Sequence, residues 1–379
     1  MLTAPAPSEV EQYCAWYGDS RNQVLYFGAS PFWPAYREAG GDPRADLRAE
    51  GPQIIGRFDL KRLAFAEPLV VGEPDARAGV WDVLAHPNGR IYFTTYFESA
   101  GYVDPSSGRV RRFESAGLGL NELYLGEDAV ILATRYGESA SGQVRRFESA
   151  GPGLNELYHG EDAVILATRY GESESDQGSV VILDTEGVIL AEHPLEAPEG
   201  YQTAPKSLAF DPVREEIWVN TDLLPTAEGE GEVRYDTRVL GPTGRERLRF
   251  ERPEVQFMTF GPDGTGYFAE RDGPMLSLRI RSPERAGAAI FTGRIVPLDD
   301  EFPGDHDFVP ELRVDARGRV VVTRWSGRIH LVSRSGEVEQ IQLPRTGGGG
   351  LYYTGVLTGG RLCATYCDEV TVVCHALGR

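Results

Sequence analysis

Short apolar runs recur along the chain, and each follows residues that favour turns. In QVLYFGAS (23–30) and RIYFTTYF (90–97), apolar side chains occupy consecutive positions, whereas an amphipathic helix would space them every three or four residues. Such runs are typical of strands that are covered on both faces. The pattern predicts eight of these central strands, which begin at residues 23, 90, 129, 163, 216, 265, 319 and 361.

Further strands are predicted on both sides of each central strand. A shorter apolar stretch with a turn precedes it, as in WDVLAHPNG (81–89), and two strands usually follow, as in GSVVILDTEGVILAEHPL (178–195). Gly, Asn, Asp and Pro at the junctions suit hairpin turns. Each unit is therefore a four-stranded meander, and the spacing of the units resembles the roughly 40 to 50 residues of a propeller blade. We predict an all-β fold in which residues 1–379 form a single β-propeller domain.

Residues 108–141 and 142–175 form a tandem repeat. The two copies differ at only four positions: Arg109/Gln143, Leu118/Pro152, Leu125/His159 and Ala140/Glu174. Such near identity indicates a recent or engineered duplication. Each copy holds the last strand of one blade and the first two strands of the next. Because each blade contacts mainly its neighbours, we predict an eight-bladed ring, a seven-bladed parent plus a duplicated blade of about three strands. The alternative is seven blades with one copy extruded from the ring.

The last unit has only three predicted strands. We expect LTAPAPSEVE (2–11) to add the fourth, because prolines are tolerated on an edge strand and the pairing would close the ring. Within this unit, a hairpin turning at Asp368 and Glu369 would place Cys363 opposite Cys374. A cross-strand disulfide is then possible. Two buried thiols in a β-core are an equal alternative.

The charge of the chain limits its partners. There are 38 basic and 57 acidic residues, a formal net charge of −19, and Lys61 and Lys206 are the only lysines. This charge would repel phosphate backbones and anionic lipid surfaces, so nucleic acid and membrane partners are not expected. No stretch approaches the roughly 18 apolar residues of a membrane span, and the first residues lack the basic and apolar regions of a signal peptide. We expect a soluble protein, and its compartment stays open.

One phrase of the sequence resembles a known family. GVWDVLAHPNGRIYFTTY (79–96), followed by GYVDPSSGRV (101–110), is similar to the repeated blade sequence of gluconolactonases and senescence-marker proteins, and of the related virginiamycin-lyase-like propellers. The resemblance implies a divalent cation at the mouth of the central channel, held by Glu, Asn and Asp side chains at the starts of innermost strands. It implies that the family's asparagine corresponds to Asn155 or to its duplicate Asn121. Lys206 stands where the family usually has an asparagine.

Polar residues at the starts of innermost strands are also candidates on geometric grounds, because these strands converge on one small space. Oxygen-bearing side chains there would suit Ca²⁺ or another divalent cation. In the alternative interpretation, they only satisfy backbone groups beside a water-filled channel. The candidates are Asp82, Asn121, Glu122, Asn155, Glu156, Lys206 and Gln256.

An acidic segment, DDEFPGDHDF (299–308), precedes another innermost strand. His306 and Asp307 are the candidate catalytic residues, because neighbouring carboxylates can raise the pKa of a histidine into the range of a general base. A solvated acidic connection is the alternative. Of the other histidines, His86 lies beside a turn and is expected on the surface, and His330 lies in an apolar run and is expected to be structural.

A long insertion at 30–52 interrupts the first unit. It carries Phe32, Trp33 and Tyr36, which would form a lid or a partner-binding loop over one channel mouth. The alternative is that these aromatic side chains pack against their own blade.

The sequence favours a ligand-binding or protein-binding propeller, whose partner is a small molecule or another protein. One alternative is a divalent-cation-dependent hydrolase, lactonase-like or esterase-like, or a lyase, with its site at the central channel mouth. Another is a chain made or chosen to study blade duplication. The sequence lacks a nucleophile elbow, a phosphate loop, a dinucleotide fingerprint and an HExxH motif, so whether the protein is an enzyme stays open.

Overall fold

The structure is a computed structural model that describes most of the predicted strands. For some of the described residues the backbone alone is described. The described residues are 2–5, 13–19, 23–29, 53–72, 80–95, 100–113, 120–125, 131–135, 178–183, 186, 188–225, 232–241, 245–251, 255–272, 275–281, 294–299, 311–314, 318–324, 327–343, 351–358, 361–366 and 371–376.

The described residues form seven antiparallel sheets of four strands each, which we number as blades in chain order. Blade 1 contains β2 (Tyr13–Asp19), β3 (Val24–Ala29), β4 (Gln53–Asp59) and β5 (Ala64–Gly72). Blade 2 contains β6 (Val80–Ala85), β7 (Ile91–Thr95), β8 (Ala100–Val103) and β9 (Val110–Arg112). Blade 3 contains β10 (Leu120–Leu125), β11 (Ile131–Arg135), β12 (Ser179–Leu183) and β13 (Ile189–Pro194).

The remaining blades follow the same order along the chain. Blade 4 contains β14 (Tyr201–Asp211), β15 (Glu216–Pro225), β16 (Arg234–Leu240) and β17 (Glu246–Glu251). Blade 5 contains β18 (Val255–Phe260), β19 (Gly266–Asp272), β20 (Met275–Arg281) and β21 (Arg294–Asp299). Blade 6 contains β22 (Glu311–Val314), β23 (Val320–Thr323), β24 (Arg328–Val332) and β25 (Val338–Gln342). Blade 7 contains β26 (Leu351–Thr358), β27 (Arg361–Tyr366), β28 (Thr371–Ala376) and β1 (Leu2–Pro5).

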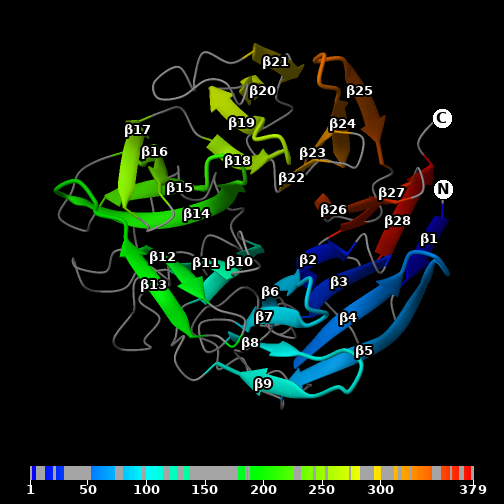
Figure 1. Cartoon of the computed structure of the whole chain (residues 1–379). Helices are drawn as coiled ribbons and strands as arrows, with labels where there is room; N and C mark the ends of the chain where they lie inside the picture. The colour runs from blue at the N-terminus through cyan, green and yellow to red at the C-terminus, as the bar shows by residue number, and fades with distance from the viewer. Residues whose placement is uncertain are drawn as a thin grey trace, which may run out of the picture.

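The seven blades form a closed ring. The innermost strand of each blade contacts that of the next, and a contact between β26 and β2 completes the circuit. Figure 1 shows the sheets arranged around a common centre. No helix occurs among the described residues, and so none of them belongs to a helix long and apolar enough to cross a membrane. The predicted all-β propeller is confirmed.

The hydrophobic core is divided among the gaps between neighbouring blades. In β15, Trp218 is buried against blade 5, where its ring centroid lies 5.5 Å from that of Phe268. The adjacent residues of the same strand, Ile217 and Val219, belong to the cluster shared with blade 3. A strand whose two faces both meet another blade needs apolar side chains at consecutive positions, which explains the runs seen in the sequence.

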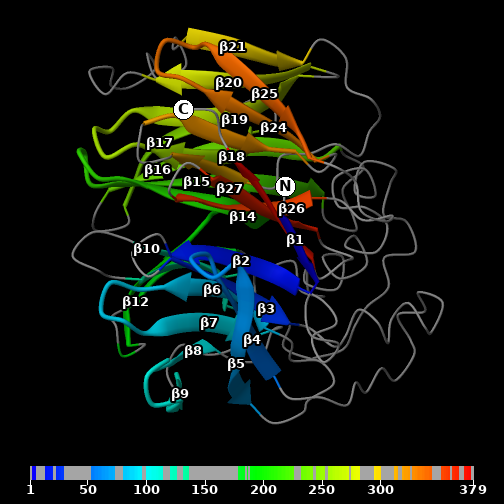
Figure 2. The ribbon, with the colours of Figure 1, turned by 90° about the vertical axis from the view of Figure 1, so that its right-hand side faces the viewer.

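The N-terminal strand closes the ring, as predicted. β1 pairs with β28 in an antiparallel register that runs from Leu2 opposite Cys374 to Pro5 opposite Thr371. Figures 1 and 2 both show this strand beside the C-terminal strands of the chain. β1 is the outer strand of its sheet, so Pro5 removes no hydrogen bond from a central position.

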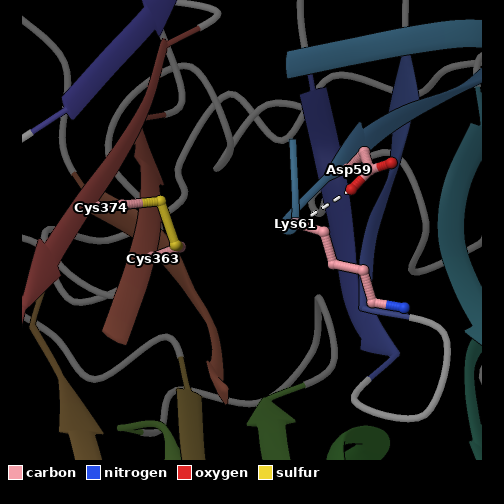
Figure 3. The surroundings of a disulfide bond; sticks show 4 residues. All are labelled: Asp59, Lys61, Cys363 and Cys374. Carbon is pink, nitrogen blue, oxygen red and sulfur yellow. Dashed lines mark hydrogen bonds between the residues drawn. A yellow bond between two sulfur atoms is a disulfide. The ribbon is translucent and has the colours of Figure 1, made fainter. Parts of the chain in front are cut away.

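A disulfide links Cys363 and Cys374 within blade 7, which confirms the first of the two predicted alternatives. The two residues are direct partners in the register of β27 and β28, and their Cα atoms lie 4.0 Å apart. Both sulfur-bearing side chains are buried in a cluster that includes Phe27 and Phe58 of blade 1. Figure 3 shows the bond on blade 7 and the neighbouring blade 1. The disulfide therefore lies where the ring is closed.

The eight-bladed ring is not confirmed. The first copy of the repeat supplies β9, β10 and β11, as predicted, but β11 pairs directly with β12, which follows the second copy in the sequence. The described sheet of blade 3 therefore uses one copy, and the closed circuit of seven blades is that of the seven-bladed alternative. Residues 142–175, and the insertion at 30–52, lie outside the described residues.

Candidate functional site

Six of the seven described innermost strands share a β-bulge. In β14, for example, Pro205 is opposite Thr221 and Ser207 is opposite Asn220, so Lys206 is an extra residue with no partner of its own in the register. A bulge bends its strand and changes the direction of a side chain, and bulges are over-represented beside active sites. The bulge residues are Cys14, Trp81, Asn121 with Glu122, Lys206, Gln256 and Tyr352.

The six bulges lie at the same end of the ring. In five blades the bulge interrupts the pairing of the innermost strand with the last few residues of the second strand. In blade 4 the two strands are longer, and five more pairs follow the bulge in the same direction. Because neighbouring innermost strands contact each other, bulges at equivalent places surround one end of the central channel. We call this the bulge end of the ring. The opposite end, where the first and second strands are joined by hairpins, we call the turn end.

The structure places four of the sequence candidates at bulges. Asn121 and Glu122 together face the single residue Thr134, and Lys206 and Gln256 are the extra residues of β14 and β18. Asn121, Glu122 and Gln256 lie near the starts of their innermost strands, whereas Lys206 lies in the middle of β14. Any role of these residues in binding stays a prediction.

Asp82 directly follows the bulge residue of β6. Its Oδ1 accepts a hydrogen bond of 2.8 Å from the backbone N–H of Val83. This contact matches the alternative interpretation, in which a polar side chain near the channel satisfies a backbone group. Within the described part of the chain, no group of three or more His, Cys, Asp or Glu side chains is placed to hold a metal ion.

The other predicted site residues lie outside the described residues and stay predictions. They are Asn155 and Glu156 for the metal, His306 and Asp307 for catalysis, and Phe32, Trp33 and Tyr36 for the lid or partner loop.

The burial of two histidines, His86 and His330, can be compared with the positions predicted from the sequence. His86 is buried, which corrects the expectation of a surface position. Its Nδ1 accepts a hydrogen bond from the backbone N–H of Asn88, and its ring centroid lies 5.2 Å from that of Tyr92. The turn therefore folds the imidazole inward over its own hairpin. His330 is buried in β24, as a structural histidine would be.

A buried polar ladder crosses blade 4 beside the bulge of Lys206. The amide Nδ2 of Asn220 donates to Oγ of Ser207 at 2.9 Å, and the hydroxyl of Thr237 donates to Oδ1 of Asn220 at 3.0 Å. All three side chains are buried. The ladder links β14, β15 and β16 directly at the bulge, and it holds the backbone on both sides of Lys206 in place.

Thr221 is the most unusual polar residue at this end. Its side chain is buried, with 1% of the residue exposed, and its hydroxyl has no hydrogen-bond partner in the part of the chain that the structure describes. In the register it stands opposite Pro205, immediately beside Lys206. A buried hydroxyl without a partner is destabilising, so its presence beside a bulge points to a site and not to core packing.

Buried carboxylates at the bulge end have arginine partners. Arg279 donates two hydrogen bonds to Glu270, of 2.6 and 2.7 Å, and Glu270 is the register partner of the residue before Gln256. In blade 4, Asp236 lies 3.0 Å from Arg238 and 2.7 Å from Arg249. These two acids are therefore neutralised inside the protein.

Four polar residues near the Lys206 bulge are not among the candidates predicted from the sequence: Ser207, Asn220, Thr221 and Thr237. A signal is present in EIWVNTDL (216–223), where three consecutive polar residues interrupt an apolar run. The bulge residues Cys14, Trp81 and Tyr352 were not predicted either, because thiol and aromatic side chains are common in apolar strands.

Comparisons with known proteins show the fold. No protein-family model matches the chain, and no curated protein matches it. Similar solved structures include a catalytically inactive variant of virginiamycin B lyase from Staphylococcus aureus with quinupristin, at 11% sequence identity and a TM-score of 0.59, covering 98% of this chain and 97% of that one. Another is the β-propeller domain of Cps50 (Swd1) from Myceliophteria thermophila, at 10% identity and a TM-score of 0.59, covering 100% of both chains. The chain therefore has the propeller fold that the resemblance implied, at an identity that shows the fold alone.

Proposed function

We propose that this protein is a ligand-binding β-propeller that takes a small molecule at the bulge end of its channel. The observation that carries the proposal is the set of bulges on six of the seven described innermost strands. The residues at the six bulges are a lysine, a glutamate, an asparagine, a glutamine, a tyrosine, a tryptophan and a cysteine. Ligand sites commonly combine apolar and aromatic groups with a few convergent polar groups, often at the mouth of a barrel or ring.

Lys206 is the residue that we expect to dominate recognition. It is one of only two lysines in a chain of 38 basic residues, and it is the bulge residue beside the buried ladder and Thr221. Two buried acids near this end, Glu270 and Asp236, have arginine partners. The ammonium group suits a ligand that carries a carboxylate or another anionic group.

A cation-dependent hydrolase or lyase is the second proposal. Asn121 and Glu122 share one bulge of the same ring, and amide and carboxylate oxygens are preferred ligands of Ca²⁺. His306 and Asp307 would then supply the general base.

A thermal-shift screen tests the first proposal. The purified chain is screened against a panel of small organic acids, their neutral amides, and Ca²⁺ with and without a chelator. We expect an acid, but not its amide, to raise the melting temperature. The change Lys206→Met should weaken binding of that acid at least about tenfold, because it removes a charge-assisted hydrogen bond.

The matched control is Lys61→Met. Lys61 lies in the turn after β4, with an exposed side chain that Figure 3 shows, and its backbone N–H donates to Asp59 at 2.8 Å. This variant should bind as the unchanged protein does. If the Lys206→Met protein binds the acid with the same affinity as the unchanged protein, the ligand binds at another site. Turnover of a lactone or ester that stops when the chelator is added would favour the second proposal instead.

A further inference from the structure

Blade 3 is assembled from two parts of the chain that are far apart in sequence. Its inner strands β10 and β11 belong to the first copy of the repeat, and its outer strands β12 and β13 follow the second copy. Figure 1 shows the two pairs side by side in one sheet. The register of β11 with β12 runs from Ile131 opposite Leu183 to Arg135 opposite Ser179.

The second copy repeats the residues that make these pairs. Residues 154–159 match β10 except that His159 replaces Leu125, and residues 165–169 are identical to β11. The backbone hydrogen bonds of a ladder do not depend on side-chain identity, and the side chains that pack on the neighbours are the same at ten of the eleven strand positions. The second copy can therefore form the same pairs with β12.

The connecting lengths do not select one copy either. With the first copy in place, the connections are residues 113–119 and 136–178, of 7 and 43 residues. With the second copy in place, they would be residues 113–153 and 170–178, of 41 and 9 residues. Loop closure depends only weakly on length, so it favours the first arrangement by only about 1.4-fold.

We propose that either copy can complete blade 3, so that the chain populates two seven-bladed forms that exchange the first copy for the second. The form with the first copy is the major one, because Leu125 is more apolar than His159 at the end of β10. The exchange itself does not depend on the proposed function. Its consequence for the candidate site rests on that function: the Asn–Glu bulge is encoded twice, as Asn121 and Glu122 and as Asn155 and Glu156.

Hydrogen exchange followed by mass spectrometry tests the proposal on the full chain. Peptides that contain Leu118 and Leu125 can be distinguished by mass from those that contain Pro152 and His159. Exchange of the copies requires both strands to leave the sheet, which is a local unfolding event and is slow compared with labelling. Each peptide should therefore show a protected and an unprotected population, and the two protected fractions should add to one.

The change His159→Leu makes the second copy identical to the first at all positions that correspond to β10 and β11. We expect it to raise the protected fraction of the second copy to about two fifths, as the remaining 1.4-fold preference requires. Complete protection of the first copy with none of the second, in both proteins, would overturn the proposal. Complete protection of both copies would also overturn it, because it would indicate an eight-bladed ring.

The duplicated bulge has a separate test. If the exchange is observed, Glu122→Ala in the His159→Leu protein should leave about two fifths of the chains with an intact Asn–Glu pair, whereas Glu122→Ala combined with Glu156→Ala leaves none. Calcium binding by the single and double variants then tests the second proposal, in which the Asn–Glu pair helps to hold a cation. Equal calcium binding by the two variants, with strand exchange observed, would count against that cation site and not against the exchange.

Discussion

The two ends of the ring are built differently. At the turn end, the first two strands of blades 2, 4 and 5 are joined by tight turns, in which Gly89 and Gly264 adopt φ values of 89° and 75°. These turns make ion pairs with the next blade: Arg90 with Glu186, Asp211 with Arg281, and Asp263 with Arg334. Each pair links one blade to its neighbour, so the turn end holds the blades in sequence.

The bulge end has irregular strands instead of tight turns. The bulges interrupt the ladders, and the buried hydroxyl of Thr221 has no partner in the described part of the chain. These features lower stability where no packing benefit is apparent. Proteins retain such features mainly where binding or catalysis requires them, which supports the proposal that ligands bind at the bulge end while the turn end contributes stability.

The largest effect is expected at the turn end. Asp211 is fully buried, and its Oδ1 accepts hydrogen bonds from the backbone N–H groups of Val213 and Arg214. Its Oδ2 accepts a hydrogen bond of 3.1 Å from the Arg214 guanidinium and lies 4.0 Å from the buried Arg281. Asp211→Ala removes a buried carboxylate from both arginines and from the turn, so we expect a loss of about 3–5 kcal/mol in the free energy of unfolding. Denaturant titration measures it. Ligand binding by the folded fraction should be unchanged, and a loss of binding at constant stability would contradict the division between the ends.

Thr221→Val should have a smaller and opposite effect. Valine has the shape of threonine without the unpartnered hydroxyl, so we expect the free energy of unfolding to rise by about 1 kcal/mol. Binding at the bulge end should weaken if the hydroxyl contacts the ligand. A matched control is Thr237→Val, which removes a hydroxyl that donates to Asn220 and should destabilise the protein. If Thr221→Val also lowers the free energy of unfolding, the hydroxyl contributes to stability. The buried hydroxyl is then no longer evidence for a binding site beside Lys206.

Much of the fold could be predicted because it is encoded locally. The pairing of Cys363 with Cys374 follows from the position of a hairpin turn, and the closing role of Leu2–Pro5 follows from a final unit with one strand too few. The bulge position of Gln256 coincides with the first polar residue of an otherwise apolar stretch of β18. In each case, neighbouring residues in the sequence carry the information.

The rest depends on contacts that the sequence pattern does not specify. The pairing of Glu270 with Arg279 requires knowledge of which face of β19 meets blade 4, and the inward position of His86 depends on its stacking with Tyr92. The number of blades could not be predicted for another reason. The two copies are nearly identical in sequence, so the pattern of apolar residues does not show which of them pairs with β12, or whether both form blades.

The smallest effect is expected for the exposed ion pair of the turn end. Glu186 accepts a hydrogen bond of 2.5 Å from Arg90 and also pairs with Arg111, and the hydrogen bond from Arg90 is the main reason that the pKa of Glu186 is lowered. Because these side chains are partly exposed, Glu186→Gln should cost at most about 1 kcal/mol and less at high salt.

The pH dependence of this pair has a defined sign. A carboxylate with a lowered pKa in the folded state stabilises the protein above its ordinary pKa of about 4.3, and this contribution is lost as the pH falls through the lower folded value. The difference in unfolding free energy between the unchanged protein and Glu186→Gln should therefore be constant near neutral pH and vanish in acid. Glu339→Gln, on the exposed outer strand β25, is the control for the substitution itself. A difference between the Glu186 proteins that persists in acid would show that side-chain packing, and not charge, links blades 2 and 3 at this point.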